Sequence, residues 1–156
     1  MRLARLFLLL AVLAAPVLAA DVSIVRLLPS YRTTASFQRL SEFFTGRENP
    51  GKETMLRSQA ADRAGYYWFL RVENKGTAFA EATFELQVIT SASPDPRTFT
   101  FRTPVPHGKQ VFNVGVTGSD WPTAGDEPVA WKLVVRSTAG ELVSAQSFLW
   151  SKPAAK

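Results

Sequence analysis

Residues 83–88 have the sequence Thr-Phe-Glu-Leu-Gln-Val, in which polar and apolar side chains alternate. Successive side chains of a β-strand point to opposite faces, so this pattern puts Phe84, Leu86 and Val88 on one face and polar residues on the other. Such a strand is typical of an antiparallel sheet that is covered on one side. The stretch therefore predicts a β-strand whose apolar face is directed into the core.

The preceding segment, residues 66–72, has the sequence Tyr-Tyr-Trp-Phe-Leu-Arg-Val and is apolar on both faces of an extended chain. The two faces would carry Tyr66, Trp68, Leu70 and Val72 on one side, and Tyr67 and Phe69 on the other. A strand that is buried on both faces belongs in the middle of a sheet. The segment therefore predicts a central strand, and Glu-Asn-Lys-Gly at 73–76 predicts the turn that follows it.

Further short apolar segments are bounded by clusters of Gly, Pro, Asn and Ser, which favour turns. They are residues 22–28, which Pro29 is expected to end, 54–57, 99–101 (after the link Pro94-Asp95-Pro96), 112–116, 129–136 and 142–150. In 99–101 and 112–116 the face opposite the apolar one is expected to meet water. Gly140 can take the positive φ that a short hairpin loop needs. Residues 37–44 fit both a helix and a strand, and we interpret them as a strand.

Seven to nine strands with frequent turns predict an all-β fold, a single antiparallel β-sandwich. A Greek-key barrel would leave the same pattern, and the pairing order stays open. At residues 72–76, Val-Glu-Asn-Lys-Gly, followed by Ala78, Phe79 and the alternating strand, the chain resembles the fibronectin-III-like and immunoglobulin-like modules of exported bacterial proteins. The resemblance covers residues 66–150. It implies the architecture and a role in adhesion, assembly or binding, but no chemistry.

The first 20 residues have the layout of a cleavable signal peptide, with a signal helix. Arg2 and Arg5 precede an apolar run over residues 6–18, and Ala19 and Ala20 supply small residues for cleavage. We place the cleavage after Ala20, although cleavage after Ala19 also fits. The run is shorter than the roughly 20 residues that span a bilayer, so no permanent membrane span is expected.

The domains expected are therefore a signal peptide over residues 1–20, a β-sandwich over 21–150 and a polar C-terminal tail over 151–156. We expect the mature protein to be soluble in the periplasm or outside the cell. The chain has no cysteine, so its stability must come from apolar burial rather than from disulfides. Without the leader 16 basic residues face 13 acidic ones, a net charge of +3, and they form no runs. We therefore expect no nucleic-acid partner.

The inventory of reactive side chains is small. His107 is the only histidine and lies in the turn Pro-His-Gly at 106–108. There is no cysteine nucleophile and no Gly-x-Ser-x-Gly elbow, and one histidine is too few for a zinc site. A glycosidase needs only two carboxylates, so a hydrolase stays as the third hypothesis. We expect a protein that is not an enzyme and uses no cofactor.

Two kinds of residue could form a binding site. Asp120, Asp126 and Glu127 lie in the loop 118–128 and could bind calcium, but their spacing departs from the EF-hand pattern and we prefer a solvated loop. Several aromatic residues could form a platform for sugar rings or a peptide. They are Tyr66, Tyr67, Trp68, Trp121, Trp131 and Trp150. We expect Trp68 and Trp131 to be buried and Trp121 to be partly exposed, which makes it the candidate ligand contact.

These observations favour an exported, non-catalytic module that makes protein contacts or assists assembly in the cell envelope. The alternative is a domain that binds envelope glycan through exposed aromatic residues. The partner is therefore an envelope protein or a glycan, and the sequence identifies neither it nor the oligomeric state.

Overall fold

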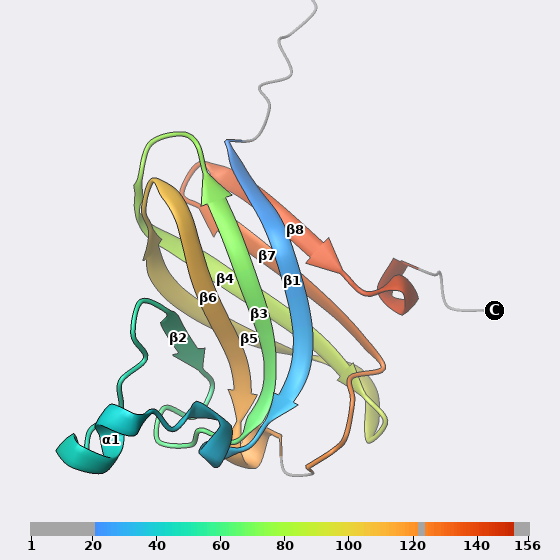
Figure 1. The fold of residues 1–156 in the computed structure, drawn as a ribbon. Coiled ribbons are helices and arrows are strands. Elements are labelled where there is room, and N and C mark those ends of the chain that lie inside the picture. Colours follow the sequence, from blue (N-terminus) through green and yellow to red (C-terminus); the bar gives the residue numbers. More distant parts are fainter. Residues whose placement is uncertain (1–20, 122–123, 152–156) are drawn as a thin grey trace, which may run out of the picture.

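The computed structural model describes residues 21–121 and 124–151, and these residues form two four-stranded sheets (Figure 1). The strands are β1 (Val22–Arg32), β2 (Thr54–Arg57), β3 (Gly65–Asn74), β4 (Phe79–Thr90), β5 (Ser93–Val105), β6 (Gly108–Thr117), β7 (Ala130–Ser137) and β8 (Gly140–Gln146). The helices are α1 (Leu40–Thr45) and three short 3-10 helices, η1 (Thr34–Phe37), η2 (Gly118–Asp120) and η3 (Phe148–Ser151). The predicted leader with Ala20, and residues 152–156 of the tail, lie outside the described part.

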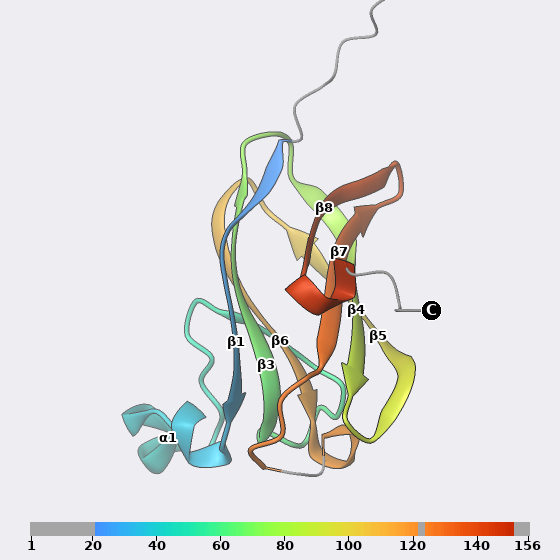
Figure 2. The same ribbon diagram turned by 90° about the vertical axis from the view of Figure 1, so that its right-hand side faces the viewer.

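The strand order is β1-β3-β6-β2 in the first sheet and β5-β4-β7-β8 in the second. All pairs are antiparallel except β2 with β6, which is parallel. Seen edge-on, the sheets form two layers (Figure 2). The described chain is thus mostly β and forms two sheets rather than a barrel, as expected for a β-sandwich. No helix among the described residues is long and apolar enough to cross a membrane.

The core lies between the sheets and confirms the strands predicted at residues 83–88 and 66–72. Phe84 and Leu86 of β4 are fully buried, and so is Trp68 of β3. The strand β3 lies between β1 and β6, so it is a central strand as predicted. Two aromatic pairs join the layers. The ring centroids of Phe84 and Phe112 are 4.9 Å apart, and those of Trp68 and Trp131 are 6.1 Å apart.

Prolines do not end strands where the sequence suggested they would. β1 continues through Pro29 to Arg32, and β5 already includes Pro94 and Pro96. Both are edge strands, where the missing N–H of proline breaks no pairing inside the sheet. At the C-terminal end the prediction was too long, because β8 stops at Gln146 and Trp150 lies in η3.

Residues 37–44 are not a strand, so that interpretation was wrong. Phe37 ends η1, and α1 runs from Leu40 to Thr45. Gly46 caps the helix with a φ of 63° and an N–H bond to the Glu42 carbonyl oxygen (2.8 Å). The Phe37 ring lies 4.7 Å from that of Tyr67, on the outer face of β3. The apolar residues at 37–44 therefore do not share one sheet face.

The outer face of β6 does not meet water as predicted. Asn113 is fully buried there, and a Cβ on Gly115 would lie only 2.4 Å from Cε1 of Tyr67. Residues 33–64, between β1 and β3, pack over this part of the first sheet and include β2 (Figure 1). We call residues 33–64 the cover segment. It covers Tyr67 of β3 but leaves the part of the sheet around Arg26 and Arg71 exposed, and this exposed area holds the candidate site.

Candidate functional site

A β-bulge in β1 determines which side chains reach the open face of the first sheet. Ile24 pairs with Val72 and Arg26 pairs with Arg71, so Val25 is an extra residue in the edge strand. Strict alternation from Ile24 would direct Arg26 into the core, whereas the bulge turns it outward. Arg26 and Arg71 therefore lie directly opposite each other on the outer face.

The next row of the sheet supplies an apolar floor. Leu28 pairs with Phe69, and in the row of the arginines Arg71 pairs with Val111 of β6. These side chains surround a surface cavity of about 240 Å³. We call this site the arginine groove, lined by Arg26, Leu28, Phe69, Arg71 and Val111. It places two cationic groups above an apolar surface.

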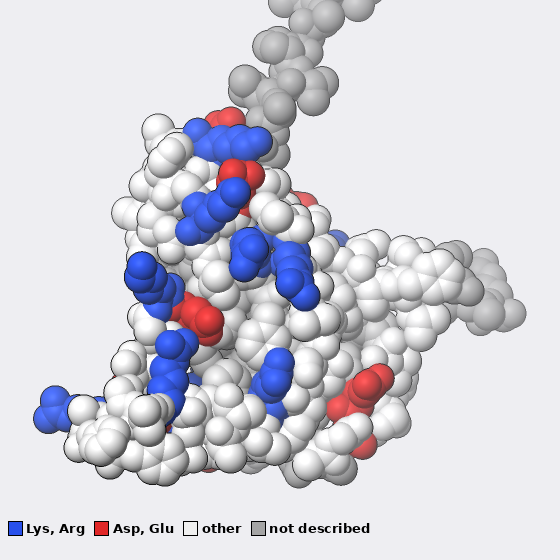
Figure 3. Space-filling model, viewed as in Figure 1, with Lys and Arg blue, Asp and Glu red and all other residues white. Residues whose placement is uncertain are grey.

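The arginine groove lacks counter-charges. Arg26 and Arg71 are exposed and form no ion pair with any acidic residue in the described part of the chain. Like charges opposite each other across two strands destabilise a sheet. Glu73, one row away, lies 3.9 Å from Lys109 and 4.0 Å from Lys75. Figure 3 shows several basic side chains over this face and few acidic ones.

Positive charge continues on the far side of Phe69. The Arg32 guanidinium lies 5.1 Å from the centroid of the Phe69 ring, close enough for a cation–π contact. A second surface cavity of about 270 Å³ is lined by Arg32, Arg39, Phe69 and the acidic Glu53, among others. Phe69 is therefore shared by two adjoining cavities, with arginine side chains beside each.

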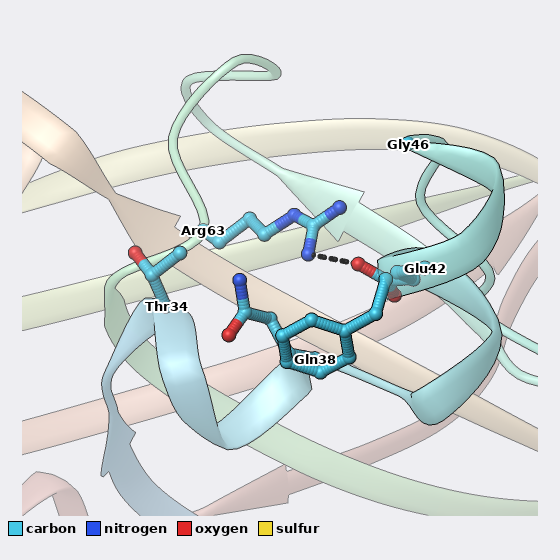
Figure 4. A pocket seen from close by; sticks show the side chains of 6 residues that line it. Thr34, Gln38, Glu42, Gly46 and Arg63 are labelled. Carbon is cyan, nitrogen blue, oxygen red and sulfur yellow. Dashed lines mark hydrogen bonds and ion pairs between the residues drawn. The ribbon is translucent and has the colours of Figure 1, made fainter.

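A cluster of ion pairs attaches the cover segment to the sheet. Arg57, whose side chain is 6% exposed, binds Glu48 and donates from Nε to the Tyr67 hydroxyl at 3.0 Å. The Tyr67 hydroxyl donates to the Arg63 carbonyl oxygen at 2.8 Å, and the Arg63 side chain donates to Glu42 at 2.6 Å. Figure 4 shows the Arg63 and Glu42 pair beside a cavity of about 290 Å³ between η1 and α1.

These contacts shift the pKa values of the groups that make them. The hydrogen bond from Arg57 holds the pKa of Glu48 below its ordinary value, and the hydrogen bond from Arg63 lowers the pKa of Glu42. Burial raises the pKa of Tyr67, although Arg57 acts in the opposite direction. The two acids of the cluster are therefore charged at neutral pH and paired with Arg57 and Arg63.

Trp121 is not the partly exposed residue that the sequence predicted. It is only 6% exposed and its ring centroid lies 5.0 Å from that of Tyr66. The three-residue helix η2 returns the chain to the sandwich, with the Trp121 N–H bonded to the Gly118 carbonyl oxygen at 3.0 Å. Tyr66, Tyr67 and Trp68 are buried as well. These four side chains therefore form no exposed platform.

Of the remaining aromatic candidates, Trp131 and Trp150 are half-buried, so Trp131 is less covered than predicted. His107 lies in the turn between β5 and β6, as predicted. It is exposed, with Nδ1 2.9 Å from the carbonyl oxygen of Gly76.

The three calcium candidates have different surroundings. Asp120 binds the side chains of Arg97 (2.9 Å) and Gln59 (3.0 Å), whereas Asp126 and Glu127 are exposed. Burial raises the pKa of Asp120, but hydrogen bonds and the charge of Arg97 outweigh it and lower the value. Within the described residues no group of three acidic or histidine side chains could hold a metal ion. Asp120 is thus engaged by the protein itself.

Sequence reasoning missed the arginine groove. Arg26 and Arg71 are far apart in the sequence, and only the register after the bulge brings them together. A partial signal was present at 66–72, where Tyr67 and Phe69 gave β3 a second apolar face. Part of that face is covered by residues 33–64, and Phe69 forms the floor of the site.

Comparison of the chain with protein-family models, with characterised proteins and with solved structures gave no significant match. Function must therefore be inferred from the geometry of the site.

Proposed function

We propose that this protein is an exported, non-catalytic module that binds an acidic segment of a partner protein in the arginine groove. One observation carries the proposal. Arg26 and Arg71 are held opposite each other without a counter-charge, above an apolar floor. A bound carboxylate would remove the repulsion between them and accept charge-assisted hydrogen bonds from both guanidinium groups.

The floor of the groove supports a peptide as the ligand. Leu28, Phe69 and Val111 offer apolar contacts for side chains that flank an acidic residue, and recognition of acidic motifs by arginine clusters is a recurring mode of peptide binding. A sugar ring would need the free face of an aromatic ring. Arg32 already covers one face of Phe69, and Trp121 is buried, so the glycan alternative has less support.

The chemistry of the groove supports a binding role over catalysis. Its polar side chains are guanidinium groups, which stay charged, donate hydrogen bonds and cannot act as general bases. They suit the binding of an anion. The hydrolase hypothesis would need a pair of facing carboxylates, and the groove contains none.

We also assign the sandwich to the immunoglobulin type, and the strand order supports this. If β1, β3 and β6 correspond to strands A, B and E, and β4, β7 and β8 to C, F and G, both sheets have the neighbours of an immunoglobulin sandwich. β2 takes the place next to strand E, but it comes from the cover segment and runs parallel to β6. Export rests on the arginines, apolar run and alanines of residues 1–20.

The test compares two peptides that differ only in charge. A fluorescent peptide of alternating Glu and Leu residues is titrated with the chain from Asp21 onward, and binding is followed by anisotropy. The same peptide with Gln in place of Glu is the control ligand. We expect binding of the acidic peptide only. The double variant Arg26→Glu, Arg71→Glu should weaken it at least about tenfold, since hydrogen bonds to charged groups contribute about 1.5–3 kcal/mol each.

Arg102→Glu is the matched control variant, because Arg102 is an exposed arginine of β5 in the other sheet. It should bind the acidic peptide like the parent. Equal binding of the Glu and Gln peptides would refute the proposal. So would an equal loss of affinity for the acidic peptide in the Arg102→Glu variant and in the double variant of the arginine groove. Binding of an oligouronate but of no peptide would favour the glycan alternative.

A further inference from the structure

The helix α1 presents an apolar surface that no other element of the described residues covers. Leu40, Phe43 and Phe44 are 74%, 71% and 82% exposed. Their spacing of three and four residues places them as neighbours on the helix surface. In Figure 1 the helix projects from a lower corner of the sandwich, away from both sheets. We call these three residues the apolar tip.

The structure holds the apolar tip in place. Gly46 caps α1, the Asn49 amide donates to the Ser41 hydroxyl at 3.1 Å, and the Asn49 N–H donates to Glu42 at 3.1 Å. Glu42 is in turn bound to Arg63 at 2.6 Å. The short helix is therefore linked to the segment that leads into β3, and its apolar side chains project from a defined base.

Basic residues flank the apolar tip in the sequence. Its acidic neighbours Glu42 and Glu48 are paired with Arg63 and Arg57 on the side that faces the sheet. Three exposed basic residues close to the helix in the sequence form no ion pair within the described part of the chain: Arg39, which donates to the Pro50 carbonyl oxygen, Arg47 and Lys52, which the acidic Glu53 follows. In Figure 3 the surface at this corner is mostly uncharged, with a basic side chain at its margin.

The size of the apolar tip limits what can cover it. A large apolar side chain has about 150–250 Å² of surface, so three that are mostly exposed offer on the order of 400 Å². A stable contact with a second protein molecule buries about 800 Å² on each partner. A small apolar projection with basic flanks suits the interfacial region of an anionic membrane, where apolar side chains enter the acyl boundary and basic ones meet phosphates.

We propose that the apolar tip inserts into the surface of an anionic lipid bilayer, with Arg39, Arg47 and Lys52 contacting the lipid headgroups. The arginine groove is a separate site, so this membrane contact does not depend on the acidic partner proposed above. It would hold the sandwich at a membrane surface by reversible, shallow insertion.

The test is flotation of the chain from Asp21 onward with two kinds of vesicle, phosphatidylcholine with and without phosphatidylglycerol. This form contains every core residue of the described structure. We expect binding to the anionic vesicles and weaker binding to the neutral ones. The double variant Phe43→Ser, Phe44→Ser should reduce partitioning at least about tenfold, because it removes two large apolar groups from the inserted surface.

Two control variants separate the tip from other surfaces. Val129→Ser replaces an exposed apolar residue that is distant from the apolar tip in the sequence. The double variant Arg26→Glu, Arg71→Glu reverses the charge of the arginine groove. Both should bind anionic vesicles like the parent. A fourth variant, Phe44→Trp, should show more fluorescence quenching by brominated lipid than the parent does.

Two results would overturn the proposal: no binding of the parent to anionic vesicles, or equal binding of the tip variant. Loss of binding in the groove variant alone would assign the membrane contact to the sheet instead. A concentration-dependent dimer that Phe43→Ser, Phe44→Ser dissociates, without vesicle binding by the parent, would assign the tip to a second copy of the chain.

Discussion

Trp121 lies at the end of the sandwich, where a loop residue completes the core. Its ring contacts Tyr66, whose own ring lies 5.2 Å from that of Trp68, so the three side chains form a continuous aromatic cluster. Between Asp120 and Pro122 in the sequence, nothing distinguishes it from an exposed residue. The local sequence predicts a turn, whereas the burial of the Trp121 side chain depends on its tertiary contact with Tyr66.

We predict that Trp121→Ala destabilises the protein by about 3–5 kcal/mol, the usual cost of removing a buried aromatic side chain and leaving a cavity. Chemical unfolding of the chain from Asp21 onward measures the change. Trp121→Phe should cost less, because it keeps much of the contact with Tyr66. An unchanged unfolding midpoint for Trp121→Ala would mean that the ring is not part of the core.

The cover segment is the element that the sequence described least well. Phe37, Leu40 and Phe44 have the spacing of a helix face, whereas a strand would place Phe37 and Phe43 on one side and Leu40 and Phe44 on the other. The structure that forms depends on the contact of Phe37 with Tyr67 and on the solvent around α1. In contrast, the strand at residues 83–88 could be predicted, because polar and apolar side chains that alternate one by one fit a strand with one buried face and do not fit a helix. The arginine groove could not be predicted, since it depends on a bulge that strict alternation does not show.

The ion pairs of the cover segment make its stability depend on pH. Glu48 and Glu42 have pKa values below their ordinary value of 4.5 in the folded state. A carboxyl group whose pKa is lower in the folded than in the unfolded state stabilises the fold. This stabilisation is fully present at pH values above the pKa of the unfolded state, and it is lost as the pH falls through the pKa of the folded state. We therefore expect the free energy of unfolding to decrease as the pH is lowered below about 4.5.

Glu48→Gln tests this dependence. Arg57 is almost fully buried, so loss of its carboxylate partner should cost on the order of 1–3 kcal/mol at neutral pH. The variant should also lose less stability than the parent on acidification. Urea unfolding from neutral to acidic pH measures both effects. Glu141→Gln is the control, because Glu141 is exposed and 4.0 Å from Arg136; an equal effect there would contradict the role of Arg57.

At the scale of the whole molecule, arginines on the two outer faces differ in their ion pairs. On the second sheet, Arg136 of β7 lies between Glu85 and Glu141, within 4.0 Å of each. On the first sheet, Arg26 and Arg71 have no acidic partner among the described residues. Sequence composition could not show this asymmetry.

The two layers share one core, and this predicts that they unfold together. Trp68 belongs to the first sheet and Trp131 to the second, and their rings are 6.1 Å apart, so neither sheet keeps its apolar face covered without the other. Small single domains with one core usually unfold in a single transition. We expect unfolding followed by tryptophan fluorescence and by far-ultraviolet circular dichroism to give the same midpoint.

A second measurement tests the coupling between the layers directly. Phe84 and Phe112 meet across the core at 4.9 Å, so the cycle of Phe84→Leu, Phe112→Leu and the double variant should show a coupling energy of about 0.5–3 kcal/mol. Phe84→Leu combined with the distant Ser144→Ala on β8 should be additive. Two separate transitions, or additivity of the Phe84 and Phe112 variants, would mean that each sheet is stabilised independently and that the sandwich is not one cooperative unit.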